Sequence, residues 1–258
     1  MSLLKTRNNT IAGIKLHFLL YSFFVLLSVS VCAQPAKSLV EFTSEDSLVI
    51  TADEYINADT LPYIVLLHDQ GSSRGEFSDI IERFSKMNYN CLVPDLRNGG
   101  NASYVSNETV RRCRNNGYAR TLDFVRADIR AAVSYAHLKS GSPVILIGAG
   151  ANGSLALLDA VSDTLVKAVI ALSPGEYFRP GINIEDEISE LSQPVLITST
   201  HLEYPYVLQM TSQVDEKYKT IFAPSEKAGE RGTRALLPDN DSNGEYWLTL
   251  LLFFKDLQ

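Results

Sequence analysis

Short, uninterrupted apolar runs are the feature that most restricts how this chain can fold. Residues 63–68 (YIVLLH) and 144–148 (VILIG) do not alternate between polar and apolar positions, and each run is shorter than a typical helix. Such runs are typical of strands buried on both faces, as in a parallel sheet covered by helices on two sides. Further strands of this kind are predicted at 91–94, 167–172, 194–199 and 219–222.

Segments with helical spacing of apolar residues separate these strands. In residues 75–87, one face of the predicted helix carries Phe77, Ile80, Ile81 and Phe84. Further helices are predicted at 119–138, 151–161, 206–214 and 245–257, and an N-terminal hairpin from strands at 38–42 and 48–52. The alternation predicts the α/β class: an open, doubly wound, mostly parallel sheet with helices on both faces.

Residues 97–118 are polar and rich in Asn and Gly, and we expect a long loop there. Loops of this length in compact domains are usually functional or mobile. No internal repeat or linker interrupts the pattern, so residues 34–258 are expected to form a single domain.

The N-terminus has the pattern of a secretory signal peptide at residues 1–33. A basic start is followed by an apolar stretch at 16–31, and Val31-Cys32-Ala33 ends it with small residues where signal peptidase cleaves. We expect cleavage after Ala33 and a secreted or periplasmic protein with no membrane association. A lipid anchor at Cys32 and a retained membrane anchor are the alternatives.

Charge and cysteine content exclude several kinds of protein. Cleavage would leave 225 residues and change the net charge from −7 to −10, because the segment holds three basic residues and no acidic one. That balance argues against a nucleic acid partner. The remaining cysteines, Cys91 and Cys113, lack the spacing of a zinc site, and we expect no metal and no cofactor. Whether the two pair or stay free is open.

The turn after the 144–148 strand permits two interpretations. Residues 148–153 read GAGANG, which matches the dinucleotide fingerprint G-x-G-x-x-G. However, two strands with their helices precede it, and the acidic residue expected about 20 positions later is missing. The alternative is a nucleophile elbow, a sharp strand-to-helix turn that lifts a serine above the sheet. Here Gly150 stands in place of that serine.

With this turn, the chain resembles the α/β-hydrolase superfamily, most closely its dienelactone-hydrolase-like and small serine esterase members. The resemblance extends over nearly all of residues 39–257. It is carried by the segments 66–77 (LLHDQGSSRGEF), 89–100 (YNCLVPDLRNGG), 121–136 (TLDFVRADIRAAVSYA), 171–180 (ALSPGEYFRP) and 193–200 (QPVLITST). It implies the α/β-hydrolase fold and a site built around a catalytic triad.

The resemblance also implies where the triad positions lie. The nucleophile position falls on Gly150, the acid position on Glu203 and the histidine position on Arg231. Glycine has no side chain to attack a carbonyl, and arginine keeps its proton at ordinary pH, so it is no general base. Because a triad acts as a unit, we expect a degenerate triad.

Parts of the family's pocket are expected to remain. The oxyanion hole of the family uses backbone N–H groups, which map to Ala151 and Gln70. Arg231 is expected either to pair with Glu203 or to bind an anionic ligand. The carboxylate of Asp69 would oppose an anionic ligand at the same place.

Other side chains near the predicted site have ordinary alternatives. His68 begins the first loop, where the family's histidine is usually structural. His201 and Tyr204 follow the 194–199 strand and are pocket candidates, with simple exposure or packing as the alternative. Further aromatic candidates for the pocket wall are Tyr177, Phe178 and Tyr206.

Three functional hypotheses follow. The first is an exported, catalytically degenerate serine hydrolase that binds a small molecule or a protein partner. The second is an active hydrolase of small carboxylic esters with an unusual site, such as Glu203 and His201 activating water. The third is a Rossmann-type protein that binds a dinucleotide through GAGANG.

Overall fold

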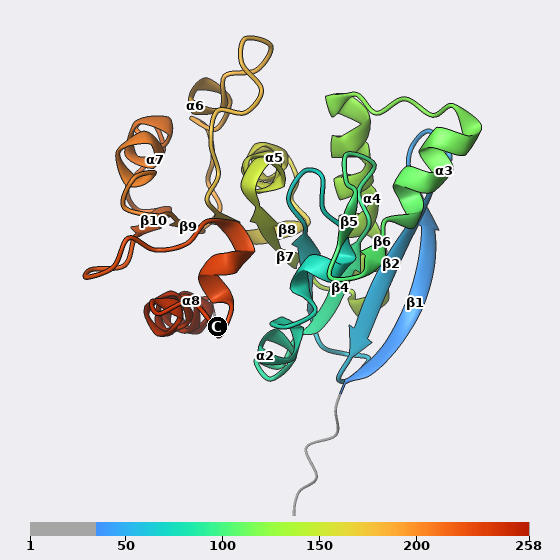
Figure 1. Ribbon diagram of the computed structural model, residues 1–258, viewed down its shortest axis with the longest axis horizontal. Coiled ribbons are helices and arrows are strands. Elements are labelled where there is room, and N and C mark those ends of the chain that lie inside the picture. Colours follow the sequence, from blue (N-terminus) through green and yellow to red (C-terminus); the bar gives the residue numbers. More distant parts are fainter. Residues whose placement is uncertain (1–34, 258) are drawn as a thin grey trace, which may run out of the picture. The chain divides into compact units, whose positions relative to one another are not determined.

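The computed structural model describes residues 35–257, so the predicted signal peptide and Cys32 lie outside the described part. These residues form one compact unit around an eight-stranded sheet (Figure 1). The strand order is β1-β2-β4-β3-β7-β8-β9-β10. Strands β1 and β2 are antiparallel to their neighbours, and the remaining pairs are parallel. The predicted α/β class and mostly parallel sheet are confirmed.

The strands of the sheet follow the apolar runs closely. They are β1 (Ala36–Thr43), β2 (Val49–Ile56), β3 (Tyr63–Leu67), β4 (Asn90–Pro94), β7 (Val144–Ala149), β8 (Val166–Leu172), β9 (Val195–Thr198) and β10 (Lys219–Phe222). The predicted N-terminal hairpin is present, with Val40 opposite Ala52 in the antiparallel register of β1 and β2.

Helices connect the strands. The long ones are α3 (Glu108–Asn116), α4 (Leu122–Ser140), α5 (Gly150–Ala160) and α8 (Asn243–Asp256). The short ones are η1 (Arg74–Phe77), α2 (Ile81–Ser85), α6 (Ile184–Glu187), α7 (Tyr204–Met210) and η2 (Gly232–Leu236). None of the helices within residues 35–257 is long and apolar enough to cross a membrane.

Strand β3 shows why its apolar run does not alternate. Ile64 and Leu66 belong to a core with residues of η1, α2, η2 and α8. Val65 and Leu67 belong to a second core with residues of α4 and α5 on the opposite face. Because successive side chains of a strand point to opposite faces, both faces of the sheet centre are buried.

The prediction of one continuous helix over residues 75–87 is wrong. The chain forms η1, a turn, and then α2. The backbone N–H groups of Ser78 and Ile80 bond three residues back, to Gly75 and Phe77, so this part winds as 3₁₀ turns. The predicted apolar face is nevertheless buried, because 3₁₀ turns also bring residues three apart to one side.

The prediction of a long loop at residues 97–118 is also wrong. This segment contains a small hairpin, β5 (Asn101–Ala102) with β6 (Val105–Ser106), followed by α3. The side chain of Asn107 accepts the N–H of Val110 at 2.8 Å and caps the start of α3. Gly117 ends the helix with a φ of +72°. Because α3 is mostly polar, its sequence resembles that of a loop.

Both described cysteines are free and buried. Cys91 lies in the core beneath η1 and α2, whereas Cys113 lies in a small cluster with Leu48 and Ile50. Burial raises the pKa of the Cys91 thiol to about 12. Of the two open alternatives, the structure shows unpaired thiols.

Candidate functional site

Gly150 lies at the sharp turn where β7 ends and α5 begins. Its φ is +51°, a conformation that glycine adopts without steric penalty. The turn also brings Gly148 and Gly153 together, since a Cβ atom on Gly148 would lie 2.7 Å from Cα of Gly153. These glycines therefore serve a tight strand-to-helix turn with the geometry of a nucleophile elbow.

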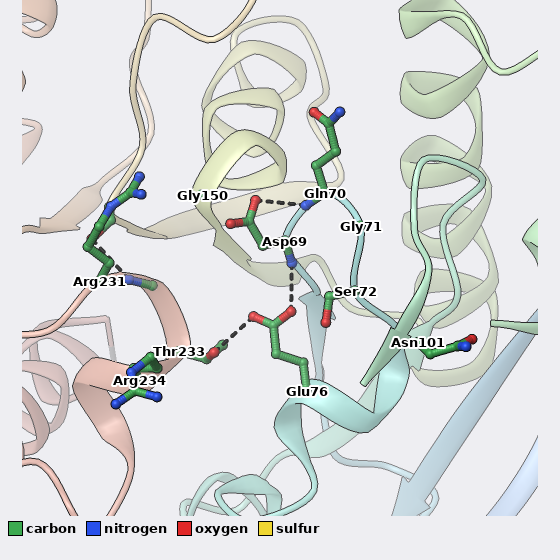
Figure 2. A pocket seen from close by; sticks show the side chains of 12 residues that line it. Asp69, Gln70, Gly71, Ser72, Glu76, Asn101, Gly150, Arg231, Thr233 and Arg234 are labelled. Atoms are coloured by element: carbon green, nitrogen blue, oxygen red, sulfur yellow. Dashed lines mark hydrogen bonds between the residues drawn. The ribbon is translucent and has the colours of Figure 1, made fainter. Parts of the chain in front are cut away.

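The carboxylate of Asp69 occupies the space beside Gly150 (Figure 2). A Cβ atom built on Gly150 would lie 2.2 Å from each carboxylate oxygen of Asp69. Oδ1 of Asp69 accepts two backbone hydrogen bonds, from the N–H of Ala151 at 2.9 Å and from the N–H of Gln70 at 2.7 Å. The two backbone donors predicted for an oxyanion hole therefore converge on one oxygen, which belongs to the protein itself.

The position of Ala151 at the start of α5 favours this arrangement. Backbone N–H groups at a helix N-terminus carry partial positive charge and stabilise an anion. In a hydrolase these donors would stabilise the oxyanion of the transition state. Here the carboxylate of Asp69 lies where that oxyanion would bind.

Glu76 holds the Asp69 segment against the opposite wall of the site. Its Oε2 accepts the backbone N–H of Asp69 at 2.9 Å, and its Oε1 accepts the hydroxyl of Thr233 at 2.9 Å (Figure 2). One carboxylate thus links the loop after β3 to η2. The position of Asp69 is set by this link as well as by its own contacts.

His68 is fully buried beneath the same loop and acts as a structural residue. Its Nε2 accepts the N–H of Leu96 at 2.9 Å, so Nδ1 carries the proton and donates to the carbonyl of Asp69 at 2.8 Å. The histidine therefore joins the loop after β3 to the end of β4. It does not line the pocket.

Arg231 and Glu203 form an ion pair between Nε and Oε1. The Nη2 of Arg231 also donates to the hydroxyl of Tyr177 at 2.6 Å. On the other side, Oε2 of Glu203 accepts the hydroxyl of Ser173 at 2.9 Å and the N–H of Thr200 at 3.0 Å. Of the two sequence alternatives for Arg231, the structure shows the pair.

These contacts determine how Glu203 ionises. Burial acts to raise the pKa of Glu203, but the hydrogen bonds and the charge of Arg231 lower that pKa below its usual value. The hydrogen bond with Glu203 in turn raises the pKa of Arg231. Both groups are therefore charged at neutral pH, and neither is suited to accept a proton.

Ser173 follows β8 with an unusual backbone conformation. Its φ is +54°, which is uncommon for a residue with a side chain. Its hydroxyl donates to Glu203 and accepts the N–H of Gly232 at 3.0 Å. This serine lines the pocket, and its hydroxyl is committed to both neighbours.

The site encloses a pocket of about 380 Å³. Among the predicted site residues, it brings together Gly150, Asp69, Gln70 and Arg231. Glu203 contributes indirectly through its pairing with Arg231. The other residues that line the pocket are Gly71, Ser72, Glu76, Asn101, Ser173, Gly232, Thr233 and Arg234.

The structure does not bring His201 and Tyr204 into this pocket. They line a separate hollow together with residues 221–225. The ring of His201 bonds through Nε2 to the carbonyl of Pro224. The suggested pairing of Glu203 with His201 to activate water thus finds no support in the geometry.

Sequence reasoning did not identify Glu76 and Thr233 as site residues. Glu76 directly precedes the buried Phe77 in a predicted helix, and its role depends on a contact with η2, 157 positions away along the chain. Thr233 lies in the segment 229–233 (GERGT), in which the resemblance marks only Arg231, at the histidine position. No local signal in the sequence reports either contact.

The chemistry available to these groups differs from that of a serine hydrolase. Position 150 offers no nucleophile, the donors of the oxyanion hole are occupied, and Arg231 holds its proton. Within residues 35–257, no group of three or more His, Cys, Asp or Glu side chains could hold a metal ion. The groups present can bind and orient a polar molecule.

Comparisons with known proteins agree with this geometry at the level of the fold. A model of the dienelactone hydrolase family matches residues 50–221. No curated protein sequence matches the chain.

Solved structures of similar fold include an esterase, a dienelactone hydrolase and a peptidase. An esterase from Pyrococcus furiosus superimposes with a TM-score of 0.66 at 17% identity, covering 86% of this chain and 93% of that one. A dienelactone hydrolase from Anabaena variabilis gives a TM-score of 0.66 at 15% identity, covering 87% and 99%. An acylaminoacyl peptidase from Pyrococcus horikoshii gives 0.63 at 12% identity, covering 89% of this chain and 43% of that one.

Proposed function

Because this chain belongs to the dienelactone hydrolase family of the α/β-hydrolase superfamily, we propose that it is a non-catalytic member that binds a small molecule in the pocket beside Gly150. The pocket of about 380 Å³ is the size of a small-ligand site. A small molecule is therefore favoured over a protein partner as its occupant.

One observation supports the proposal above all others: the carboxylate of Asp69 lies where both the nucleophile and the substrate oxygen would have to be. A side chain at position 150 would overlap that carboxylate. A substrate carbonyl would also have to displace it from the N–H groups of Ala151 and Gln70. Losing such donors in an enzyme costs about 10²–10³ in rate, before the missing nucleophile is considered.

A second candidate is an active hydrolase of small carboxylic esters. It is favoured by the family itself and by the esterase and dienelactone hydrolase of similar fold. The serine best placed for it is Ser173, whose hydroxyl bonds to Glu203. Glu203 is a weak base there, because its pKa is lowered and Arg231 holds its other oxygen.

The dinucleotide hypothesis has less support. The observed strand order differs from the 3-2-1-4-5-6 order of a Rossmann sheet. In a Rossmann protein the pyrophosphate lies at the helix start after the glycine turn. Here Asp69 already bonds to Ala151 at the start of α5, and its negative charge would repel a phosphate.

We extend the proposal to location: the protein is exported after cleavage following Ala33, as the N-terminal sequence pattern suggests. Expression of the full chain followed by N-terminal sequencing of the exported product tests this. The expected first residue is Gln34. A product that keeps residues 1–33, or one that begins with a lipidated Cys32, would contradict it.

The test of the non-catalytic proposal is a direct assay of hydrolysis. We expect the purified protein to leave short-chain nitrophenyl esters and a fluorophosphonate probe unreacted beyond background. The matched variant is Ser173→Ala, which removes the most plausible remaining hydroxyl. Hydrolysis by the wild type that this variant loses would overturn the proposal in favour of the second candidate.

A further inference from the structure

The Asp69 carboxylate reverses the electrostatic character of the pocket. In an open oxyanion hole, two N–H groups attract a ligand oxygen. Here both N–H groups bind Oδ1 of Asp69. Asp69 lines the pocket, and within residues 35–257 its other carboxylate oxygen, Oδ2, has no hydrogen-bond partner. The pocket therefore presents a carboxylate oxygen where the family presents donors.

The opposite side of the pocket has the other charge. Figure 2 shows Arg231 and Arg234 on the side of the pocket formed by η2 and the residue before it, across from the Asp69 loop. Nε and Nη2 of Arg231 bond to Glu203 and Tyr177, and no described residue accepts a hydrogen bond from its Nη1. The hydrogen bond with Glu203 is the main cause that raises the pKa of Arg231, and the charges of Tyr177, Glu203 and Asp69 add to that rise.

The remaining acidic group of the pocket does not compete for a ligand in the same way. Both oxygens of Glu76 accept hydrogen bonds, from Asp69 and from Thr233. Within residues 35–257, Oδ2 of Asp69 is thus an acceptor without a partner, and Nη1 of Arg231 is a charged donor without one. Arg234 donates through Nε to Glu230 at 3.3 Å, and neither of its Nη groups has a partner there. Ser72 and Asn101 add uncharged polar side chains to the lining of the pocket.

We propose that the pocket binds a small zwitterion of amino-acid type, with its ammonium group on Oδ2 of Asp69 and its carboxylate at Arg231 and Arg234. This inference rests on the proposed function and names its ligand class. Charge-assisted hydrogen bonds of both signs give the ligand a fixed orientation. A simple anion would meet Asp69, and a simple cation would leave the guanidinium groups unused.

Calorimetric titration of the full mature chain with matched probes tests the proposal. The zwitterions are glycine, β-alanine and γ-aminobutyrate; the controls are the amine and the carboxylate of the same length as the best zwitterion. We expect one zwitterion to bind at least about tenfold more tightly than either control, because each control lacks one charge-assisted contact. A carboxylate that binds as well as the zwitterions, or zwitterions that do not bind, would overturn the proposal.

The variant Asp69→Asn sharpens the test. It keeps an oxygen for Ala151 and Gln70 but replaces Oδ2 with an NH₂ group, which repels an ammonium. Zwitterion affinity should fall about tenfold or more, while affinity for the carboxylate does not fall. The matched control is Asp79→Asn, an exposed acid nearby that does not line the pocket. Equal affinity of wild type and Asp69→Asn would refute the assigned contact.

The two proposals fail in different ways. Ester hydrolysis by the wild type would contradict the non-catalytic function, whatever binds in the pocket. Absence of zwitterion binding in a protein that also hydrolyses no ester would contradict only the ligand class.

Discussion

At the scale of single residues, Asp69 and Gly150 depend on each other. Glycine leaves the space that the carboxylate fills, and the carboxylate uses the donors that a serine hydrolase would keep for its substrate. Restoring the triad residues alone should therefore fail. A serine at position 150 would place its Cβ atom 2.2 Å from both oxygens of Asp69.

We predict that Gly150→Ser with Arg231→His stays inactive, whereas adding Asp69→Gly creates an esterase. The third change frees the space and the N–H groups of Ala151 and Gln70, an effect of about 10² or more in rate. Nitrophenyl acetate hydrolysis and fluorophosphonate labelling of the two variants measure it. A folded triple variant that neither reacts nor labels would show that Glu203 and position 231 do not form a triad frame.

Asp159 provides a prediction of pH dependence. It is 3% exposed in α5, and its Oδ2 has no partner among the described residues. Burial raises its pKa from 3.8 to about 6, although Arg126 lies 2.7 Å from Oδ1 and opposes that rise. Between these values the folded protein holds a proton that the unfolded chain has released. The protonated carboxyl of Asp159 therefore contributes to the free energy of unfolding at low pH, and this contribution is lost as the pH rises through about 6.

The measurement is urea unfolding of wild type and Asp159→Asn between pH 4 and 7. The free energy of unfolding of the wild type, minus that of the variant, should fall as pH rises, by up to about 3 kcal/mol. Asp79→Asn, which changes an exposed aspartate, is the control variant. A difference that grows with pH would mean that Arg126 outweighs the burial of Asp159.

Site residues could be predicted from the sequence only where a local pattern marks them. The glycine turn and the order of motifs located Gly150, Glu203 and Arg231. The same motifs place Asp69 and Gln70 near the turn. The sequence does not show that the Asp69 carboxylate accepts both backbone hydrogen bonds, because this depends on a side-chain rotamer and on a contact across 82 positions of the chain.

At the scale of elements, the strands were the most predictable part. Their apolar runs reflect burial on both faces, which leaves little freedom of interpretation. The segment 97–118 was not recognised as structured, because α3 packs only one narrow face, with Val110 and Cys113, and is otherwise polar. Its capping residues, Asn107 and Gly117, carried the missing signal.

Helix ends give a prediction that isolates backbone conformation. Gly117 has a φ of +72°, and a Cβ atom there would meet nothing within 4 Å. Gly117→Ala should therefore lower the free energy of unfolding by about 1 kcal/mol through backbone strain alone.

Gly244 in the first turn of α8 is the matched control. It has equally open surroundings and no positive φ. Gly244→Ala should raise the free energy of unfolding by about 0.5–1 kcal/mol, since alanine favours the helix. Chemical denaturation measures both variants, and effects of the same sign would contradict the argument.

At the scale of the whole molecule, one buried arginine joins distant parts of the chain. Arg97 is fully buried and donates to Asp128 of α4 through Nη2 at 2.6 Å and Nε at 2.8 Å. Its Nη1 reaches Asp46, in the turn between β1 and β2, at 2.7 Å. The N-terminal hairpin, the end of β4 and α4 therefore share a single charged centre.

We predict that Arg97→Met costs about 3–5 kcal/mol of unfolding free energy, because it leaves Asp128 buried without a counter-charge. The double variant Arg97→Met with Asp128→Leu should recover much of that loss, since it removes the isolated charge as well. Urea unfolding of the wild type, the single and the double variants gives the coupling. A double variant less stable than the single one would show that shape, and not charge, is the main contribution.

The contact between Asp69 and Gly150 also imposes an order on sequence change. A serine at position 150 is sterically acceptable only after residue 69 has become smaller or has turned away. The carboxylate of an aspartate at position 69 can occupy its present position only after residue 150 has lost its side chain. Each substitution is therefore permissive for the other, and any path of single mutations towards a working triad must free the space beside Gly150 before it places a serine there.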